Sequence, residues 1–549
     1  MPVPQGISLS TTFVNVTILI FKLFAVYFQE LIGYKNNKDQ NKDSSKNPLT
    51  AAETLDHTND AFKHSIINSR NISEITAISG YVIREHVITT RDGYLLVIHK
   101  LENPKLFTRR GSYRQTDKIV YFHHGLMTSS ELFVLGSTKE KTLPYLLADL
   151  GYDVWLGNNR GNKYSRKHLK LSVSDPRFWD FSLDEFSYFD IPDTITYIKN
   201  YYPVFDDVKI TYIGFSQGCS QLFASLSLNP SLNSSIKLFV GLSPAIIPQN
   251  LNHPMFKLIV RQTASDNAFL YSLFGKRAIL PSVSFWSVIL GPRLYEMIVD
   301  KSLSLLFGWD GKNISQLQKE IGYPHMFSNS SVKSLLHWFQ IIGAKRFQMF
   351  NETCDFGLTR LSSLSESSQK KSNLVAPFPI ADHLNVPMLL FYGDEDILVD
   401  INKTKNVIVD NNEIMREKLQ LILCQGYEHM DTLWGDNVYE DVFVKIIERL
   451  EQDSKGNIDN GIGVNNKTSI ASISLQPDSS KSTNGNKTLE KPITNIVING
   501  NNTREQYING HNKITEQEGN MKVTNRIVLE HKDNKIDISN RKLINYRVY

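Results

Sequence analysis

A serine bracketed by glycines, Gly214-Phe215-Ser216-Gln217-Gly218, lies between a strand-like run that ends at Ile213 and the helix-forming residues 221–224. A serine in this setting sits on a sharp, strained turn that lifts its hydroxyl clear of the backbone. The glycines leave room for the strand and the helix to pass close together. Because the same five residues also occur in ordinary turns, the prediction that Ser216 is a nucleophile depends on its flanks.

Short apolar runs typical of strands recur along the middle of the chain. Helix-like segments, for example Leu143–Leu150 and Asp190–Asn200, separate most of them, which indicates an α/β fold with a mostly parallel sheet. Two β-type runs around Asp92-Gly93, within Glu85–His99, predict a hairpin before that alternation begins. The strands expected after it are Ile119–Phe122, Tyr152–Leu156, Val208–Ile213, Leu238–Leu242, Met388–Tyr392 and Leu419–Cys424.

The alternation stops after Ala245, and about 140 residues pass before the next good strand. Since this is far too long for a structureless loop, we expect an inserted unit at about 247–385. It is rich in aromatic and aliphatic residues, with helical spacing from Ser331 to Ile342. Residue by residue, most of these aromatics are expected to form the insertion's own core. As a whole, a helical cap over a catalytic serine supplies an apolar pocket that excludes water.

A serine nucleophile needs a base and an orienting carboxylate, which hydrolases of this architecture present in the chain order Ser, Asp or Glu, His. The predicted strand Met388–Tyr392 runs into a loop that carries Asp394 and Asp396, of which we choose Asp396. The predicted strand Leu419–Cys424 runs into the next such loop, which carries His429. Four other histidines lie within the insertion or at its edges and are worse placed: His253, His325, His337 and His383.

Two backbone amides are candidates for an oxyanion hole. Gln217 follows the nucleophile, and Leu126 follows the His-Gly pair after the predicted strand Ile119–Phe122. Losing one such donor typically costs about 3 to 4 kcal/mol of barrier. The alternative for Leu126 is a purely structural turn. The segment Gly157–Asn162 follows another strand end and is expected to line the site without a catalytic role.

Residues 1–34 are predicted to anchor the chain to a lipid phase. The stretch 7–32 is mostly apolar, and as one helix it would reach about 39 Å, against a hydrocarbon core of about 30 Å. Its polar residues recur every seven positions, and Lys22 near mid-span would cost about 2.5 to 3.5 kcal/mol at the centre of a bilayer. A helix lying in one leaflet or in a lipid monolayer, a spanning anchor and a buried globular helix all stay open.

The flanking segments differ from the folded part in composition. Residues 35–71 are polar and predict a linker, whose lysines favour the cytosolic side for the rest of the chain. The hydrolase domain is expected at 72–452, and the Asn-, Ser- and Lys-rich stretch 453–549 predicts a disordered tail. A net charge of +4 over 549 residues argues against a nucleic-acid binder. The three cysteines, Cys219, Cys354 and Cys424, have no metal-type spacing and are expected to be reduced and buried.

With these residues placed, the chain resembles the acid-lipase group of α/β hydrolases, and within it the membrane-anchored yeast steryl ester hydrolases. The resemblance covers about residues 72–450, and its motifs are specific in combination rather than singly. The matching stretches are His123–Leu126, Gly151–Trp155, Gly157–Asn162, Phe178–Ser182, Gly214–Gly218 and His429–Asp431. The resemblance implies an α/β-hydrolase fold with a mostly parallel central sheet and an inserted helical cap.

The resemblance also implies site residues: Ser216 as nucleophile, Asp396 and His429 as its partners, and the amides of Leu126 and Gln217 as oxyanion donors. It implies hydrolysis of steryl esters, and often of some triacylglycerol, at lipid droplets or cell membranes, with no metal or cofactor. Secreted and lysosomal relatives have cleaved signals and commonly a disulfide in the cap, whereas this cap has a single cysteine. A near-neutral enzyme facing the cytosol is therefore expected.

Other functions stay open from the sequence. A triacylglycerol lipase is the nearest alternative, because the shape of the pocket and not the triad selects the leaving group. A soluble thioesterase is disfavoured by the anchor. A lipid-droplet scaffold without activity is disfavoured by the complete order of Ser216, Asp396 and His429.

Overall fold

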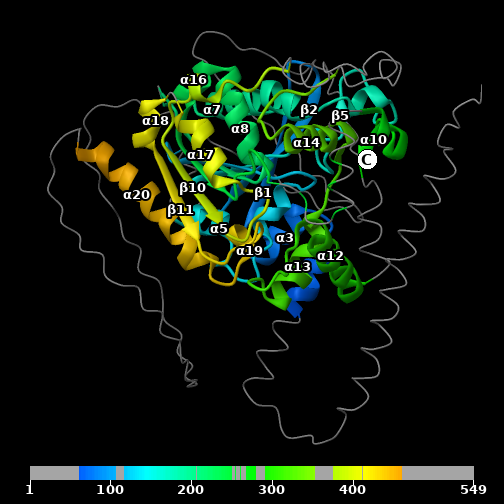
Figure 1. Cartoon of the computed structure of the whole chain (residues 1–549). Coiled ribbons are helices and arrows are strands. Elements are labelled where there is room, and N and C mark those ends of the chain that lie inside the picture. The colour runs from blue at the N-terminus through cyan, green and yellow to red at the C-terminus, as the bar shows by residue number, and fades with distance from the viewer. Residues whose placement is uncertain are drawn as a thin grey trace, which may run out of the picture. The chain divides into compact units, whose positions relative to one another are not determined.

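The computed structural model describes residues 61–106, 116–205, 207–249, 267–279, 291–352, 375–410 and 412–459, together with residues 251, 254, 257 and 260. Within these residues nine strands form one sheet, in the spatial order β1-β2-β4-β3-β6-β7-β10-β11, with β5 paired to β2 (Figure 1). The strands are β1 (Val82–Thr89), β2 (Tyr94–Glu102), β3 (Ile119–His123), β4 (Asp153–Leu156), β5 (Lys167–His168), β6 (Ile210–Phe215), β7 (Ile236–Leu242), β10 (Met388–Gly393) and β11 (Leu419–Cys424).

From β4 to β11 every neighbouring pair of strands in this order is parallel, whereas β2 pairs antiparallel with β1, β4 and β5. The predicted hairpin and the predicted mostly parallel sheet are both confirmed. Because the carboxyl ends of parallel strands meet at one edge, the loops after β3, β6, β10 and β11 come together there. These are the loops on which the sequence places its candidate site residues.

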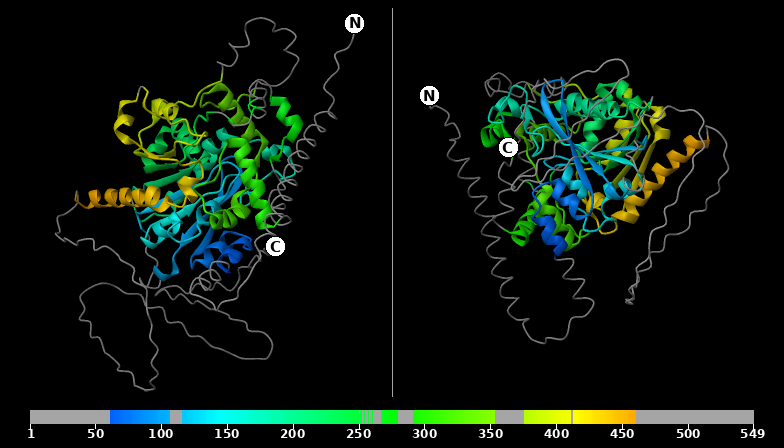
Figure 2. Two further views of the ribbon diagram at one scale, coloured as in Figure 1. Left: turned by 60° about the horizontal axis from the view of Figure 1, so that its bottom comes forward. Right: turned by 180° about the vertical axis from the view of Figure 1, so that it is seen from behind.

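Helices cover both faces of the sheet (Figures 1 and 2). One face packs against α7 (Ile191–Asn200), α8 (Gln217–Leu228), α16 (Ile380–His383), α17 (Ile401–Val409) and α18 (Glu413–Lys418). The other packs against α3 (Ile72–Ile78), α5 (Leu143–Asp149), α19 (Asp431–Trp434) and α20 (Val444–Asp459). The central strand β3 shows why two layers form. Ile119 and Tyr121 belong to the first core and Val120 and Phe122 to the second, because successive side chains of a strand point to opposite faces.

Between β7 and β10 the described part of the chain is mainly helical. It contains α10 (Asn267–Phe274), α12 (Pro292–Phe307), α13 (Gln316–Met326), α14 (Val332–Ala344) and a short antiparallel pair of β8 (Ala278–Ile279) with β9 (Ser330–Ser331). Helical spacing predicted from Ser331 to Ile342 corresponds to α14. Side chains fasten this insertion to the sheet domain, as where Gln318 of α13 donates a 2.7 Å hydrogen bond to the carbonyl oxygen of Leu135.

The predicted linker, 35–71, is wrong for its last part. Residues 61–67 are helical, Ile66 is only 2% exposed and packs into the second core, and Lys63 pairs with Glu320 of α13 at 3.0 Å. Polar composition concealed this short helix because few apolar side chains attach it, namely Ile66 and the partly buried Phe62. At the other end, α20 continues to Asp459, seven residues past the predicted boundary at 452.

The predicted anchor at 1–34, most of the predicted tail at 453–549, and Cys354 lie outside the described residues. Among the helices that the structure describes, none combines the length and the apolar character needed to cross a bilayer. Cys219 and Cys424 are free and buried, as predicted for these two.

Candidate active site

Ser216 occupies the turn between β6 and α8, with backbone φ 54° and ψ −119°. Residues that carry a side chain rarely adopt such angles, and a fold retains them only where its surroundings enforce them. Close packing leaves no room for a side chain at either flanking glycine. A β-carbon on Gly214 would lie 2.8 Å from a backbone nitrogen of α8, and one on Gly218 would lie 2.2 Å from the carbonyl oxygen of His123. The strand, turn and helix expected around Ser216 are therefore present in the structure.

Ser216, His429 and Asp396 form a continuous hydrogen-bonded relay. His429 Nε2 lies 2.7 Å from the hydroxyl oxygen of Ser216, and His429 Nδ1 lies 2.7 Å from Asp396 Oδ2. All three residues are buried: Ser216 is 9% exposed, His429 4% and Asp396 2%. They come from the loops after β6, β11 and β10, which parallel pairing brings to one edge of the sheet.

The structure also separates the two acidic candidates after β10. Asp396 Oδ2 faces His429, and its Oδ1 accepts a 2.9 Å hydrogen bond from the amide of Leu398, which fixes the carboxylate in place. Asp394 instead accepts a 2.6 Å hydrogen bond from the amide of Gly426 and braces the neighbouring loop. Only Asp396 of this pair contacts the histidine.

The loop after β3 reaches the serine through Gly125. A β-carbon on Gly125 would lie 3.0 Å from the β-carbon of Ser216, so the backbone of this loop packs directly against the nucleophile candidate. The next residue along is Leu126, and the amide of Gln217 opens α8 on the other side of Ser216. Within the described residues, the amides of Leu126 and Gln217 donate to no protein acceptor, which leaves both able to bind an oxyanion.

A buried polar network lies behind that loop. His124 Nε2 accepts a 3.1 Å hydrogen bond from the amide of Asn159, so its Nδ1 carries the proton that is donated to the carbonyl oxygen of Gly125 at 2.8 Å. Asn159 Oδ1 also binds His123 Nε2 and Gln221 Nε2, at 2.8 and 2.7 Å. Burial lowers the pKa of His123 to about 4 and that of His124 to about 3, so both rings are neutral near pH 7.

The sequence does not predict this network, since it indicates only that Gly157–Asn162 lines the site. Asn158, Asn159 and Asn162 are each at most 5% exposed. Asn159 and Asn162 both bind the ring of His124, behind the loop that carries Gly125. The signal in the sequence is the group of asparagines directly after a strand. Buried side-chain amides need hydrogen-bond partners, so such a group indicates a polar network.

Aromatic rings from two parts of the chain enclose His429. Phe215, the last residue of β6, lies with its ring centroid 5.2 Å from that of the histidine. Trp309, from the insertion, stacks on the histidine at 5.3 Å with an interplanar angle of 7°. Trp338 of α14 donates a 2.7 Å hydrogen bond to the side-chain oxygen of Gln217. Through Trp309 and Trp338 the insertion therefore contributes directly to the walls of the site.

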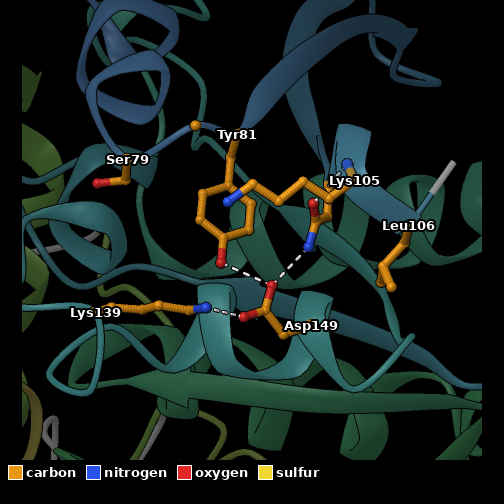
Figure 3. Close-up of a pocket in the computed structure, with 8 residues that line it drawn as sticks. Ser79, Tyr81, Lys105, Leu106, Lys139 and Asp149 are labelled. Carbon is orange, nitrogen blue, oxygen red and sulfur yellow. Dashed lines mark hydrogen bonds and ion pairs between the residues drawn. The ribbon is translucent and has the colours of Figure 1, made fainter. Parts of the chain in front are cut away.

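A separate polar cavity of about 320 Å³ is lined by Ser79, Gly80, Tyr81, Asn103, Lys105, Leu106, Lys139 and Asp149 (Figure 3). Asp149 is its centre. It accepts hydrogen bonds from Tyr81 at 2.8 Å and from Asn103 at 2.6 Å, and it pairs with Lys139. The cavity contains none of the relay residues, and the carboxylate of Asp149 joins the end of α5 to the residue before β1 and the residue after β2.

The relay has the parts needed for acyl transfer. A hydroxyl with a histidine at hydrogen-bond distance, a carboxylate that orients the histidine, and two unengaged amides beside the hydroxyl are the groups this chemistry uses. In the part of the chain that the structure describes, no three histidine, cysteine, aspartate or glutamate side chains gather as metal ligands would.

Comparison with known proteins agrees with this architecture. Residues 118–436 match the family model for the alpha/beta hydrolase fold, and residues 72–137 match the model for a partial alpha/beta-hydrolase lipase region. A Schizosaccharomyces pombe protein described as a probable lipase is 40% identical over 73% of this chain and 84% of its own length.

Two mammalian proteins are also similar. The lysosomal acid lipase/cholesteryl ester hydrolase of Macaca fascicularis is 30% identical over 70% of this chain and 91% of its own length. The gastric triacylglycerol lipase of Rattus norvegicus is 29% identical over 70% of this chain and 92% of its own length. The chain therefore belongs to the lipase family of α/β hydrolases, within the acid-lipase group.

Proposed function

We propose that this member of a family of carboxylic ester hydrolases cleaves steryl esters to free sterol and fatty acid, with Ser216 as nucleophile. The single observation that carries the catalytic part is the relay from Ser216 through His429 to Asp396, with both contacts at 2.7 Å. Its geometry is that of a base within reach of the proton it removes and of a carboxylate that fixes the base.

In the proposed reaction, His429 removes the proton of Ser216 as the hydroxyl oxygen attacks the ester carbonyl. The amides of Leu126 and Gln217 stabilise the oxyanion, and His429 then protonates the departing sterol oxygen. Water, deprotonated by His429, hydrolyses the acyl-enzyme and releases the fatty acid. Asp396 orients His429 and stabilises the imidazolium that forms in each half.

Three points support a bulky apolar ester as substrate. The insertion over the site is rich in aromatic side chains, and Trp309 and Trp338 reach the catalytic residues themselves. One relative carries the name cholesteryl ester hydrolase as well as lipase. The matched motifs of the yeast steryl ester hydrolases support the same substrate class.

Triacylglycerol is the second candidate substrate, since another relative is named a triacylglycerol lipase. Both esters would use the same relay, and the difference lies in how well the pocket accepts a rigid sterol.

The apolar N-terminal stretch and the lysines after it support a place at lipid droplets or at the endoplasmic reticulum or plasma membrane. The catalytic domain would then face the cytosol.

The test is fatty-acid release by the full chain from emulsions of cholesteryl oleate and, separately, of triolein at neutral pH. We expect faster release from cholesteryl oleate, and no release from either emulsion with Ser216→Ala. Faster release from triolein would identify triacylglycerol as the preferred substrate and leave the proposed mechanism unchanged. Equal release by wild type and Ser216→Ala would refute the proposed nucleophile.

A further inference from the structure

Trp309 lies on the catalytic histidine although it belongs to the insertion, directly after α12. Its ring is almost parallel to that of His429, at a centroid distance of 5.3 Å, and it also stacks with the ring of Phe307 at 4.3 Å. The side chain is 7% exposed, and its indole nitrogen has no hydrogen-bond partner among the described residues. Trp309 is thus held by ring contacts with His429 and Phe307, and its indole nitrogen contributes no hydrogen bond among the described residues.

Glu428, the residue before His429, fastens the backbone that follows Trp309. Its Oε1 accepts a 2.7 Å hydrogen bond from the amide of Asp310, and its Oε2 accepts a 2.9 Å hydrogen bond from the amide of Gly311. Glu428 is 6% exposed, and both of its carboxylate oxygens are used in this way. Hydrogen bonds from backbone amides to a carboxylate are among the stronger hydrogen bonds in proteins.

Asn313 adds a second attachment between the same two loops. Its side-chain amide donates to the carbonyl oxygen of Gly426 at 2.6 Å and to Asp431 Oδ2 at 2.8 Å, on either side of His429 in the sequence. The backbone carbonyl oxygen of Asn313 accepts a 2.7 Å hydrogen bond from the backbone amide of Asp436. We call residues 309–313 the strap. It runs alongside residues 426–436, the segment that carries His429.

We infer that Trp309 is a positioning residue for His429, and that Glu428 acts by holding Trp309 in place; this inference depends on the proposed function. His429 has one hydrogen bond on each ring nitrogen, and these two bonds alone would let the ring tilt about the line between them. Phe215 contacts the ring at an angle of 53°, so Trp309 is the contact that lies flat on it. A flat ring stacked at 7° removes that freedom and keeps Nε2 directed at the serine. The indole face also attracts the imidazolium that forms during the reaction.

The test compares two substitutions of Trp309 in the full chain, assayed with the soluble ester p-nitrophenyl butyrate so that adsorption to a lipid surface does not enter. Trp309→Phe retains an aromatic face, whereas Trp309→Leu removes it and keeps an apolar side chain. We expect Trp309→Leu to lower kcat by about 10- to 100-fold, with KM within about threefold of wild type. Trp309→Phe is expected to stay within about threefold of wild type in kcat.

Thermal unfolding of each variant separates positioning from folding. A folded Trp309→Leu with wild-type kcat would overturn the inference, and so would a loss in Trp309→Phe as large as that in Trp309→Leu. If Trp309→Leu fails to fold, the comparison of Trp309→Phe with Trp309→Tyr replaces it, with wild-type-like kcat expected of both. Wild-type protein that is inactive on the ester would refute the proposed function instead, so the two failures are distinguishable.

The role of Glu428 is tested by a double-mutant cycle. Glu428→Ala is expected to lower kcat less than Trp309→Leu does, and the double variant is expected to be no slower than Trp309→Leu alone, because both act on one contact. Glu395→Ala is the matched control, since it removes a carboxylate that pairs with Lys312 of the same strap at an exposed position. Fully multiplicative losses in the double variant would overturn the link between Glu428 and Trp309.

Discussion

The backbone of Gly125 packs against the side chain of Ser216 so closely that a β-carbon on residue 125 would lie 3.0 Å from the β-carbon of the serine. Ser216 cannot retreat, because its φ of 54° is fixed by the turn between β6 and α8. The backbone of the loop after β3 is therefore in direct contact with the nucleophile candidate. This contact fixes the position of the Leu126 amide.

Gly125→Ala is expected to impair activity more than stability. The added methyl group must push the loop away from Ser216 and so displace the amide of Leu126 from the position of the oxyanion. We expect kcat on p-nitrophenyl butyrate to fall by about 100-fold or more, the loss typical of a missing oxyanion donor. A kcat equal to that of wild type would mean that Leu126 does not act as a donor.

Gly218→Ala is expected to be destabilising. Its β-carbon would lie 2.2 Å from the carbonyl oxygen of His123, a backbone atom that cannot rotate away. Overpacking of this kind typically costs about 1 to 3 kcal/mol of the free energy of unfolding. Urea denaturation of the variant measures the loss, and Gly80→Ala is a control at a glycine with open space around it, although its positive φ adds some strain of its own.

The two acids after β10 are distinguished by paired substitutions. Asp396→Asn keeps the size of the side chain but removes the charge that faces His429, and a loss in kcat of about 10⁴-fold is expected, as in other triads. Asp394→Asn still accepts a hydrogen bond from Gly426 and should retain most activity. Equal losses in the two variants would contradict the assignment of Asp396.

Glu296 of α12 gives a prediction for pH. Burial, aided by the nearby Asp300 and Glu320 and opposed by a hydrogen bond from Gln316 and by Lys319, raises the pKa of its carboxyl to about 7 from an ordinary value of 4.5. The folded chain then holds this proton more tightly than the unfolded chain, so stability is lost as the pH rises from about 4.5 to about 7.

Glu296→Gln removes that penalty. The variant is expected to melt at a higher temperature than wild type at pH 8, with the difference shrinking as the pH falls toward about 4.5. Glu413→Gln, at an exposed position in α18, serves as the control. A difference between Glu296→Gln and wild type that does not change with pH would contradict the prediction.

Local patterns were enough to predict most of the sheet and the order of the relay. Ile119–Phe122 and Met388–Tyr392 each match their strand to within one residue, because buried parallel strands are short, nearly continuous apolar runs. The predicted strand Val208–Ile213 is shifted by two residues at each end, since β6 begins at Ile210 and ends at Phe215. Strand ends depend on pairing partners, which a local pattern does not contain.

The strap from Trp309 to Asn313 could not be found in this way. Asp310 and Glu428 are 118 residues apart in sequence, and neither lies in a repeating pattern that would link them. The same holds for Ile66, whose short helix sits in a polar stretch yet reaches the core. Contacts of this kind depend on how the insertion folds back over the sheet, which periodicity and composition do not encode.

The central claim is that Ser216 is a nucleophile activated by His429, and covalent labelling tests it most directly. The full chain is treated with a fluorophosphonate, and the site of the adduct is found by mass spectrometry of its peptides. We predict one adduct on Ser216, none with Ser216→Ala, and strongly slowed labelling with His429→Ala. Folded wild-type protein that stays unlabelled, or that is labelled at another residue, would contradict the account.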